Sequence, residues 1–154
     1  MDVTLKKATL ADAELLWQMQ VEAFCKTYET YRDDELSPYL EPLERTQQRI
    51  CEPITSYYVI KADGEPVGGI RIRDHGAGNP KVLGPLYVLP QWRGNGIAQR
   101  AIELVEGIHG KDNWLLDTIL QEKGNCHLYE KMGYRQIGIS QIVNERMTLV
   151  LYKK

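Results

Sequence analysis

Gln91-Trp92-Arg93-Gly94-Asn95-Gly96 is the stretch of this 154-residue chain that decides its fold. It follows a strand-like segment, Val82–Leu89, and precedes an apolar set at helical spacing that ends before Gly110: Ile97, Ala101, Leu104, Val105 and Ile108. The two glycines let the backbone turn tightly and approach a ligand closely. The free N–H groups of the first helical turn then lie at the positive end of the helix dipole, with Arg93 nearby. The stretch predicts an anion site between a strand and a helix.

Other loops share part of this pattern. An ordinary strand-to-helix turn can also contain two glycines. A Walker loop needs a Lys-Ser or Lys-Thr end, which this chain does not supply. A dinucleotide-binding fingerprint needs a small residue where Gln99 stands, although Asp112 and Asp117 lie about where the ribose carboxylate would fall. A nucleotide-dependent oxidoreductase therefore stays among the alternatives.

On both sides of the loop, the spacing of apolar residues changes between that of helices and that of strands, and these changes predict the remaining elements. Helices are expected over Ala13–Phe24, over Leu43–Cys51, after Gly96 and over Asn125–Met132, with Tyr28–Pro42 as an irregular connection. The expected strands are Val3–Lys7, Tyr57–Ala62, Pro66–Arg73, Val82–Leu89, Trp114–Ile119, Tyr134–Ser140 and Met147–Tyr152. The order is βααβββαβαββ, and its strand–helix–strand crossover implies one parallel pair in a mostly antiparallel sheet. We expect an α/β fold (an α+β mixed sheet flanked by helices) that forms one domain over residues 1–154.

Two dipeptides refine this picture. Asp63-Gly64, between two strand candidates, is a strong hairpin signal. Gly84-Pro85 interrupts the strand before the glycine loop. Because proline cannot donate to a ladder and glycine marks bulges, that strand is expected to be distorted there.

Composition narrows the class of protein. Hydrophobic residues make up 43% and charged residues 26%, as in ordinary globular proteins, and the formal net charge of -2 argues against a nucleic-acid partner. The three cysteines form no Cys-x-x-Cys pair, so neither a metal site nor a disulfide framework is indicated. No apolar run is long enough for a membrane span, and the N-terminus lacks a signal peptide's apolar core. We expect a cytoplasmic protein without a membrane partner.

Two motifs together resemble a known family. Gln91–Ala98 resembles the acyl-CoA-binding motif of the GNAT superfamily of N-acetyltransferases, Gln/Arg-x-x-Gly-x-Gly/Ala, and Leu86–Pro90 is similar to the segment that leads into it. Leu128–Tyr134 is similar to the family's Leu-Tyr-Glu-Lys-x-Gly-Phe stretch. The motifs cover about residues 81–140. One position departs, because the family often has Asn seven residues before the tyrosine and this chain has Glu122.

The resemblance implies an N-acetyltransferase with acetyl-CoA (coenzyme A) as co-substrate. Its acceptor would be the primary amine of a small molecule or peptide, which attacks directly. Tyr129 is the implied catalytic acid, because a phenol stays protonated at neutral pH and can donate to the departing sulfur. Asn125, one turn earlier, is a candidate for a contact with the pantetheine arm. The implied coenzyme-binding residues are Leu86, Val88, Arg93, Gly94, Asn95, Gly96, Ile97, Ala98 and Asn125.

The general base and the acceptor are less defined. No acid or histidine lies on Val82–Leu89, where many relatives place one. Glu22, Asp74, His75 and Asp117 are candidates, each of which also fits a surface role, and the amine could lose its proton to water. His109 and His127 are interpreted as structural or solvated.

The acceptor is expected near the first two helices and their connection. Acids and aromatics alternate there, either to receive a cationic amine or as a solvated loop: Tyr28, Glu29, Tyr31, Asp33, Asp34, Glu35 and Tyr39. The missing strand acid and Glu122 support a second hypothesis, a non-catalytic acyl-CoA-binding regulatory module. The chain is expected to be a monomer or a homodimer.

Overall fold

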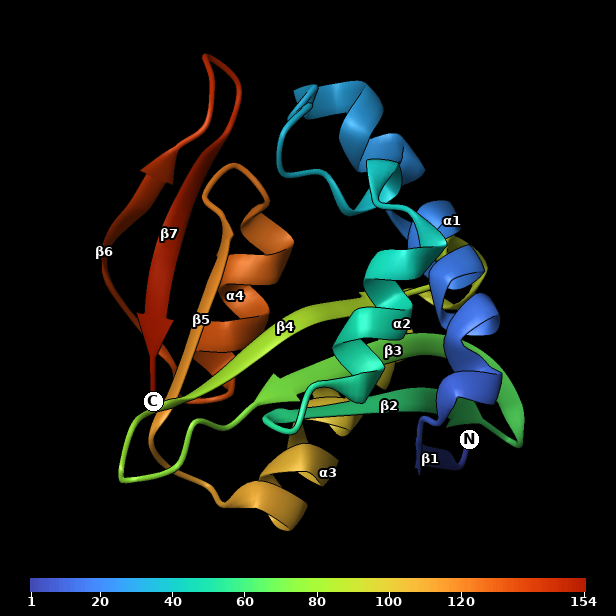
Figure 1. Ribbon diagram of the computed structural model, residues 1–154. Coiled ribbons are helices and arrows are strands. Elements are labelled where there is room, and N and C mark those ends of the chain that lie inside the picture. Colours follow the sequence, from blue (N-terminus) through green and yellow to red (C-terminus); the bar gives the residue numbers. More distant parts are fainter.

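The computed structural model describes residues 1–154 and contains one seven-stranded sheet, in the order β1-β2-β3-β4-β5-β7-β6 (Figure 1). The strands are β1 (Val3–Lys7), β2 (Thr55–Ala62), β3 (Glu65–Arg73), β4 (Lys81–Val88), β5 (Trp114–Ile119), β6 (Arg135–Ile142) and β7 (Thr148–Lys153). All neighbouring strands are antiparallel except β4 and β5, which are parallel. This arrangement confirms the mixed sheet and the element order expected from the sequence.

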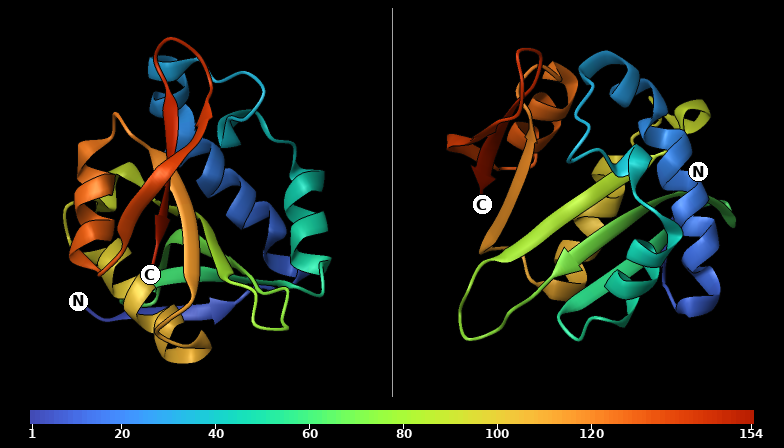
Figure 2. Two further views of the ribbon diagram at one scale, coloured as in Figure 1. Left: turned by 90° about the vertical axis from the view of Figure 1, so that its left-hand side faces the viewer. Right: turned by 45° about the horizontal axis from the view of Figure 1, so that its top comes forward.

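Helices cover both faces of the sheet (Figure 2). The helices are α1 (Ala13–Tyr31), α2 (Leu43–Cys51), α3 (Ile97–His109) and α4 (Lys123–Lys131), with single 3-10 turns at Leu10–Asp12, Pro38–Leu40 and Pro90–Trp92. A buried cluster of 19 residues joins the sheet to α3 and α4, and a second cluster of 7 joins it to α1. None of these helices combines the length and apolar character needed to cross a membrane.

Helix α1 is longer than its sequence pattern indicated. The prediction of irregular backbone from Tyr28 onward is wrong for four residues, because the helix continues to Tyr31. Tyr31 is buried and packs the last turn of the helix against the rest of the protein. The charged residues around it in the sequence hide this apolar position from a search for helical spacing. The helix ends at Arg32, which takes a left-handed conformation (φ 50°) while its N–H bonds to Tyr28 at 2.8 Å.

The β2–β3 hairpin turns at Asp63 and Gly64, both with positive φ (49° and 84°), which confirms the hairpin prediction. In the next pair of strands, β3 and β4 change register. Ile72 pairs with Leu83 but Ile70 pairs with Leu86, so that two residues of β4 stand opposite Arg71. Those two residues are Gly84 and Pro85, and the expected distortion of β4 is therefore confirmed.

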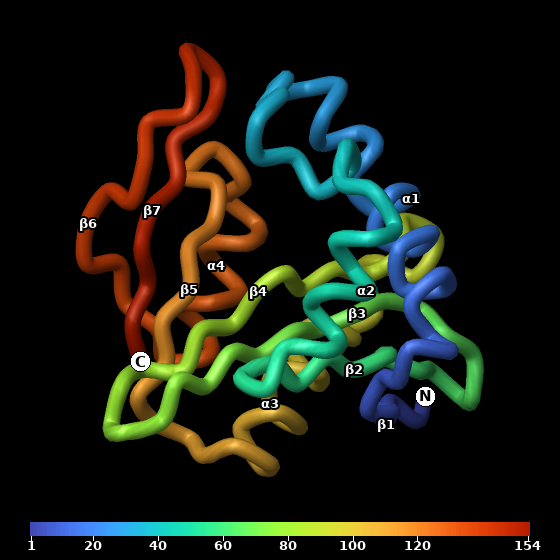
Figure 3. The backbone as a smooth tube through the Cα atoms, in the orientation of Figure 1, coloured from blue at the N-terminus to red at the C-terminus, as the bar shows by residue number.

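Strands β4 and β5 begin together and then separate, as the backbone tube shows (Figure 3). Their ladder has only two residue pairs, Lys81 with Trp114 and Val82 with Leu115. Beyond those pairs, the edge of β4 that faces away from β3 has no strand beside it. The candidate active site lies at this opening in the sheet.

Candidate active site

The Gly94–Gly96 loop has the backbone geometry of an anion site. Gly94 and Gly96 have φ values of 80° and 74°, in the left-handed region that favours glycine, and a Cβ at either position would meet no atom within 4 Å. Gly96 is the N-cap of α3 and supplies no side-chain cap. The N–H groups of residues 94–99 donate no hydrogen bond within the chain. Six consecutive backbone donors at the start of a helix are thus without a partner in the chain.

Arg93 fastens this loop to two other elements. Its Nε donates to the backbone oxygen of Val88 at 3.0 Å, and its Nη2 donates to the backbone oxygen of Ala23 in α1 at 2.7 Å. The guanidinium is therefore held between β4 and α1, at the wall of a cavity. The side chain of Asn95 folds back on the preceding turn, with Nδ2 bonded to the backbone oxygen of Trp92 at 2.9 Å.

The free edge of β4 supplies further donors. Leu89 N–H bonds to the Val67 oxygen at 2.8 Å, and Tyr87 pairs with Gly69 in the same register. Because backbone groups alternate along an antiparallel ladder, the N–H groups of Leu86 and Val88 point away from β3, toward the gap left by β5. The family resemblance implied Leu86 and Val88 as coenzyme-binding residues, and in the structure both line the same cavity as Gly94 and Gly96.

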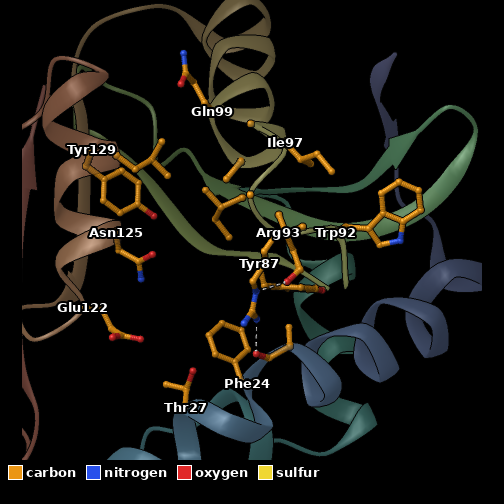
Figure 4. A pocket seen from close by; sticks show the side chains of 17 residues that line it. Phe24, Thr27, Tyr87, Trp92, Arg93, Ile97, Gln99, Glu122, Asn125 and Tyr129 are labelled. Carbon is orange, nitrogen blue, oxygen red and sulfur yellow. Dashed lines mark hydrogen bonds between the residues drawn. The ribbon is translucent and has the colours of Figure 1, made fainter. Parts of the chain in front are cut away.

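Helix α4 presents three polar side chains on one face. Glu122, Asn125 and Tyr129 are three and four residues apart, which aligns them along the helix. Figure 4 shows Asn125 and the hydroxyl of Tyr129 directed into the cavity. Glu122, at the start of α4, accepts a hydrogen bond from the hydroxyl of Tyr31 at 3.1 Å.

Tyr129 lies between aromatic neighbours. Its ring packs edgewise on Tyr134 and at a tilt on Tyr152, with centroid distances of 6.0 and 6.2 Å. Its hydroxyl makes no hydrogen bond within the chain. Burial, with smaller contributions from Asp117 and Cys126, raises the pKa of Tyr129 well above its ordinary value. The phenol therefore stays protonated at neutral pH and is available as a donor.

Two cavities of about 430 Å³ each meet at Tyr129. We call the first the loop cavity, because it is bounded by the glycine loop, β4, α1 and α4; the second, the sheet cavity, lies among β3, β4, β5 and β7. Both are lined by Phe24, Thr27, Leu86, Asn125 and Tyr129. The α1 residues among them were not predicted, because nothing in a helix's own pattern shows which distant loop it will face.

The sheet cavity has more charged side chains in its lining than the loop cavity, where only Arg93 and Glu122 are charged. The sheet cavity is lined by Asp33, Arg49, Arg71, Arg73 and Asp117. The three arginines had not been identified from the sequence, and Asp33 is the only member of the acidic and aromatic stretch that reaches either cavity. Tyr28 and Tyr39, from the same stretch, stack on each other instead, with a centroid distance of 5.4 Å.

The candidate bases are scattered. Of the four, only Asp117 lines a cavity, and the other three are exposed elsewhere. His109 bonds through Nε2 to the hydroxyl of Tyr58 at 2.8 Å, and burial lowers the pKa of this imidazole. His127 is exposed. The two histidines thus have the structural and solvated positions expected.

The family model described as the acetyltransferase (GNAT) family matches residues 16–134, which include the glycine loop, the β4 edge and Tyr129. This chain belongs to the GNAT acetyltransferase family. The resemblance seen in the sequence is thereby confirmed, and this GNAT protein is by family an acyl-CoA-dependent transferase. No curated protein matches its sequence.

Solved structures share the fold at low sequence identity. PaiA N-acetyltransferase from Thermoplasma acidophilum, in complex with coenzyme A, is 18% identical with a TM-score of 0.79, and the match covers 100% of each chain. Microcin C7 self immunity acetyltransferase MccE, in complex with acetyl-CoA and AMP, is 17% identical with a TM-score of 0.77, over 99% of this chain and 92% of the other. Spermidine N-acetyltransferase from Vibrio cholerae, in complex with CoA and spermine, is 16% identical with a TM-score of 0.73, over 97% and 93%.

Proposed function

We propose that this GNAT protein, acting as one domain over residues 1–154, transfers an acetyl group from acetyl-CoA to the primary amine of a small molecule or peptide. One observation carries the proposal: the loop cavity and the sheet cavity meet at the buried, protonated Tyr129. A cavity with six free N–H groups suits a phosphorylated co-substrate, and a second cavity with charged walls suits a polar acceptor.

The residues that line the loop cavity fit coenzyme A. The free N–H groups of residues 94–99 would hold its pyrophosphate, and the open space over Gly94 and Gly96 leaves room for it. The amides of Leu86 and Val88 would hold the pantetheine arm along the free edge of β4, with Asn125 on the opposite wall. When bound, acetyl-CoA supplies an acyl group already activated as a thioester.

Three groups of the chain would assist the transfer. The Leu86 or Val88 amide donates to the acyl oxygen, where negative charge develops. The Tyr129 hydroxyl donates a hydrogen bond to the departing sulfur and stabilises the thiolate as the C–S bond breaks, and the proton that the amine gives up balances the charge of the thiol product. Asp33, whose carboxyl pKa is raised by burial, lines the sheet cavity and accepts the proton from the amine, directly or through water.

Thermal unfolding with a ligand panel tests the first half of this proposal. Acetyl-CoA and CoA should stabilise the protein, by about 2.7 kcal/mol at a hundred times Kd, whereas NAD and FAD should not. Stabilisation by NAD or FAD alone would instead favour an oxidoreductase.

Release of free thiol across a set of amines tests the second half. Thiol should appear only when acetyl-CoA and a suitable amine are both present. Tight CoA binding with no thiol release from any amine class would favour the second candidate, a non-catalytic acyl-CoA-binding module. Two features support that candidate: β4 carries no acid or histidine, and Glu122 stands at the position where the family often has Asn.

A further inference from the structure

Arg71 is a buried cation without a matched partner. Its residue is 7% exposed and lines the sheet cavity, yet its side chain makes no hydrogen bond, and its Nε is buried without an acceptor. The nearest carboxylate belongs to Glu52, 4.0 Å from Nη2 and on a side chain that is 42% exposed. A buried guanidinium in this state is costly unless something else bonds to it.

Of the two neighbouring arginines, Arg49 has a matched partner and Arg73 does not. Arg49 makes a bidentate pair with Glu41, at 2.9 and 2.6 Å, and is thereby neutralised. Arg73 resembles Arg71, because its Nε is buried and has no acceptor. Burial, followed by the charges of Arg49 and Arg73, lowers the pKa of Arg71 to about 10, so the guanidinium is still positive at neutral pH.

Strand register places these charges close to the proposed chemistry. Arg71 stands opposite the Gly84–Pro85 bulge, and the next β4 residue toward the loop cavity is Leu86. Adjacent strands are about 4.8 Å apart, so Arg71 is one strand away from the beginning of the free amide edge. The sheet cavity that contains both arginines also reaches Tyr129.

We propose that the amine acceptor carries an anionic group, a carboxylate or a phosphate, which Arg71 and Arg73 bind in the sheet cavity. This inference rests on the proposed acetyl transfer and specifies its substrate class. A guanidinium offers paired donors that match both anions. The same two charges repel a further cationic group placed beside them. The other charged groups in the lining are Arg49, which Glu41 neutralises, and the carboxylates of Asp33 and Asp117. Asp33, on another wall of the cavity, is left for the amine end of the molecule.

Matched pairs of acceptors test the charge preference. Amino acids are compared with their amides, phosphoethanolamine with ethanolamine, and spermidine serves as a purely cationic amine. We expect kcat/KM from thiol release to be at least about tenfold higher for the anionic member of the preferred pair. The pair with the larger ratio identifies the anion as carboxylate or phosphate. Higher kcat/KM for the neutral amines or spermidine would overturn the inference and leave acetyl transfer intact.

Substitution of Arg71 and Arg73 tests whether these two residues cause the preference for anionic acceptors. Arg71→Gln and Arg73→Gln should each reduce the anionic-to-neutral ratio about tenfold or more, while the stabilisation by acetyl-CoA stays unchanged. Arg135→Gln, on the exposed strand β6, is the control and should keep the ratio. A ratio that survives both cavity substitutions contradicts the inference. Arg73→Gln keeps the test valid if Arg71→Gln does not fold.

A binding measurement separates this inference from the proposed chemistry. Calorimetric titration of amino acids and phosphoethanolamine into the CoA-bound protein needs no turnover. Binding that Arg71→Gln abolishes supports the anion site even if no amine releases thiol. The absence of any such binding to the wild-type protein overturns it.

Discussion

The hydroxyl of Tyr31, at the end of α1, donates a hydrogen bond to the carboxylate of Glu122, at the start of α4, over 3.1 Å and 91 residues of sequence. Glu122 lines the loop cavity, so this bond joins two of its walls. Burial and then the Glu122 carboxylate raise the pKa of Tyr31. Glu122 stands where the family often has Asn, and Tyr31 lies where its hydroxyl can donate to this carboxylate.

The Tyr31–Glu122 pair should show energetic coupling. We expect Tyr31→Phe and Glu122→Ala each to reduce the free energy of unfolding, and the double variant to lose less than the sum, with a coupling of about 1 kcal/mol. Urea unfolding of the four proteins measures this cycle. Losses that add without coupling would show that the bond contributes nothing to stability.

Substitution of Arg93 by Lys should loosen the glycine loop. A lysine ammonium cannot bond Val88 and Ala23 with the planar geometry of the guanidinium, and a lost bond to a charged group costs about 1.5–3 kcal/mol. Acetyl-CoA affinity should fall with stability, as measured by calorimetry and urea unfolding. Arg100→Lys, an exposed position paired only with Glu103, should change neither.

Two glycines near the start and the end of α3 form a matched comparison. Gly96→Ala puts a side chain at φ 74°, which costs about 1–2 kcal/mol and places a methyl group in the space proposed for phosphate. Affinity for CoA and stability should both fall. Gly107→Ala, inside the helix and with nothing within 4 Å of the new Cβ, should stabilise by up to about 1 kcal/mol and leave affinity unchanged. Equal CoA affinity in both variants would remove the loop from the binding site.

Tyr129→Phe should separate catalysis from binding. The loss of the proton donor should reduce kcat by about a hundredfold or more, with CoA affinity nearly unchanged. Burial raises the Tyr129 pKa above the ordinary tyrosine pKa of 10.0. As the pH is raised to 10.0, the wild-type rate should therefore not fall because of deprotonation of Tyr129. Tyr39→Phe, outside both cavities, is the control for kcat. Unaltered turnover in Tyr129→Phe would assign the acid role elsewhere.

Asp33→Asn should raise stability and lower activity. Burial raises the folded-state pKa of Asp33, so the folded protein holds this proton more tightly than the unfolded chain does. Stability therefore declines as the pH rises through that range, and the ionised carboxylate destabilises the fold at neutral pH. We expect Asn to raise the free energy of unfolding at neutral pH, and this gain should disappear as the pH falls toward the ordinary aspartate pKa of 3.8. Urea unfolding against pH measures the gain, and thiol release measures the loss expected of a base.

The sequence by itself determined the order of the elements, the hairpin at Asp63–Gly64, the distortion at Gly84–Pro85 and the glycine loop. Each depends on a local property: a repeat of apolar residues, a missing N–H, or a φ value that only glycine adopts readily. For the same reason, two short motifs were sufficient to predict the family. The helix end at Tyr31 was missed because its burial depends on a distant part of the chain.

Only the tertiary structure decided what surrounds Tyr129. The β3–β4 register puts Arg71 opposite the bulge, the short β4–β5 ladder opens the sheet, and a loop after α1 brings Asp33 to the same cavity. In the sequence, these three residues stand among other charged residues and cannot be told apart from residues of the protein surface. Whether a guanidinium or carboxylate is buried and unpaired depends on long-range packing, because each potential partner comes from another element. The loop that defines the fold is local, whereas the charge of the proposed acceptor depends on the arrangement of the whole sheet.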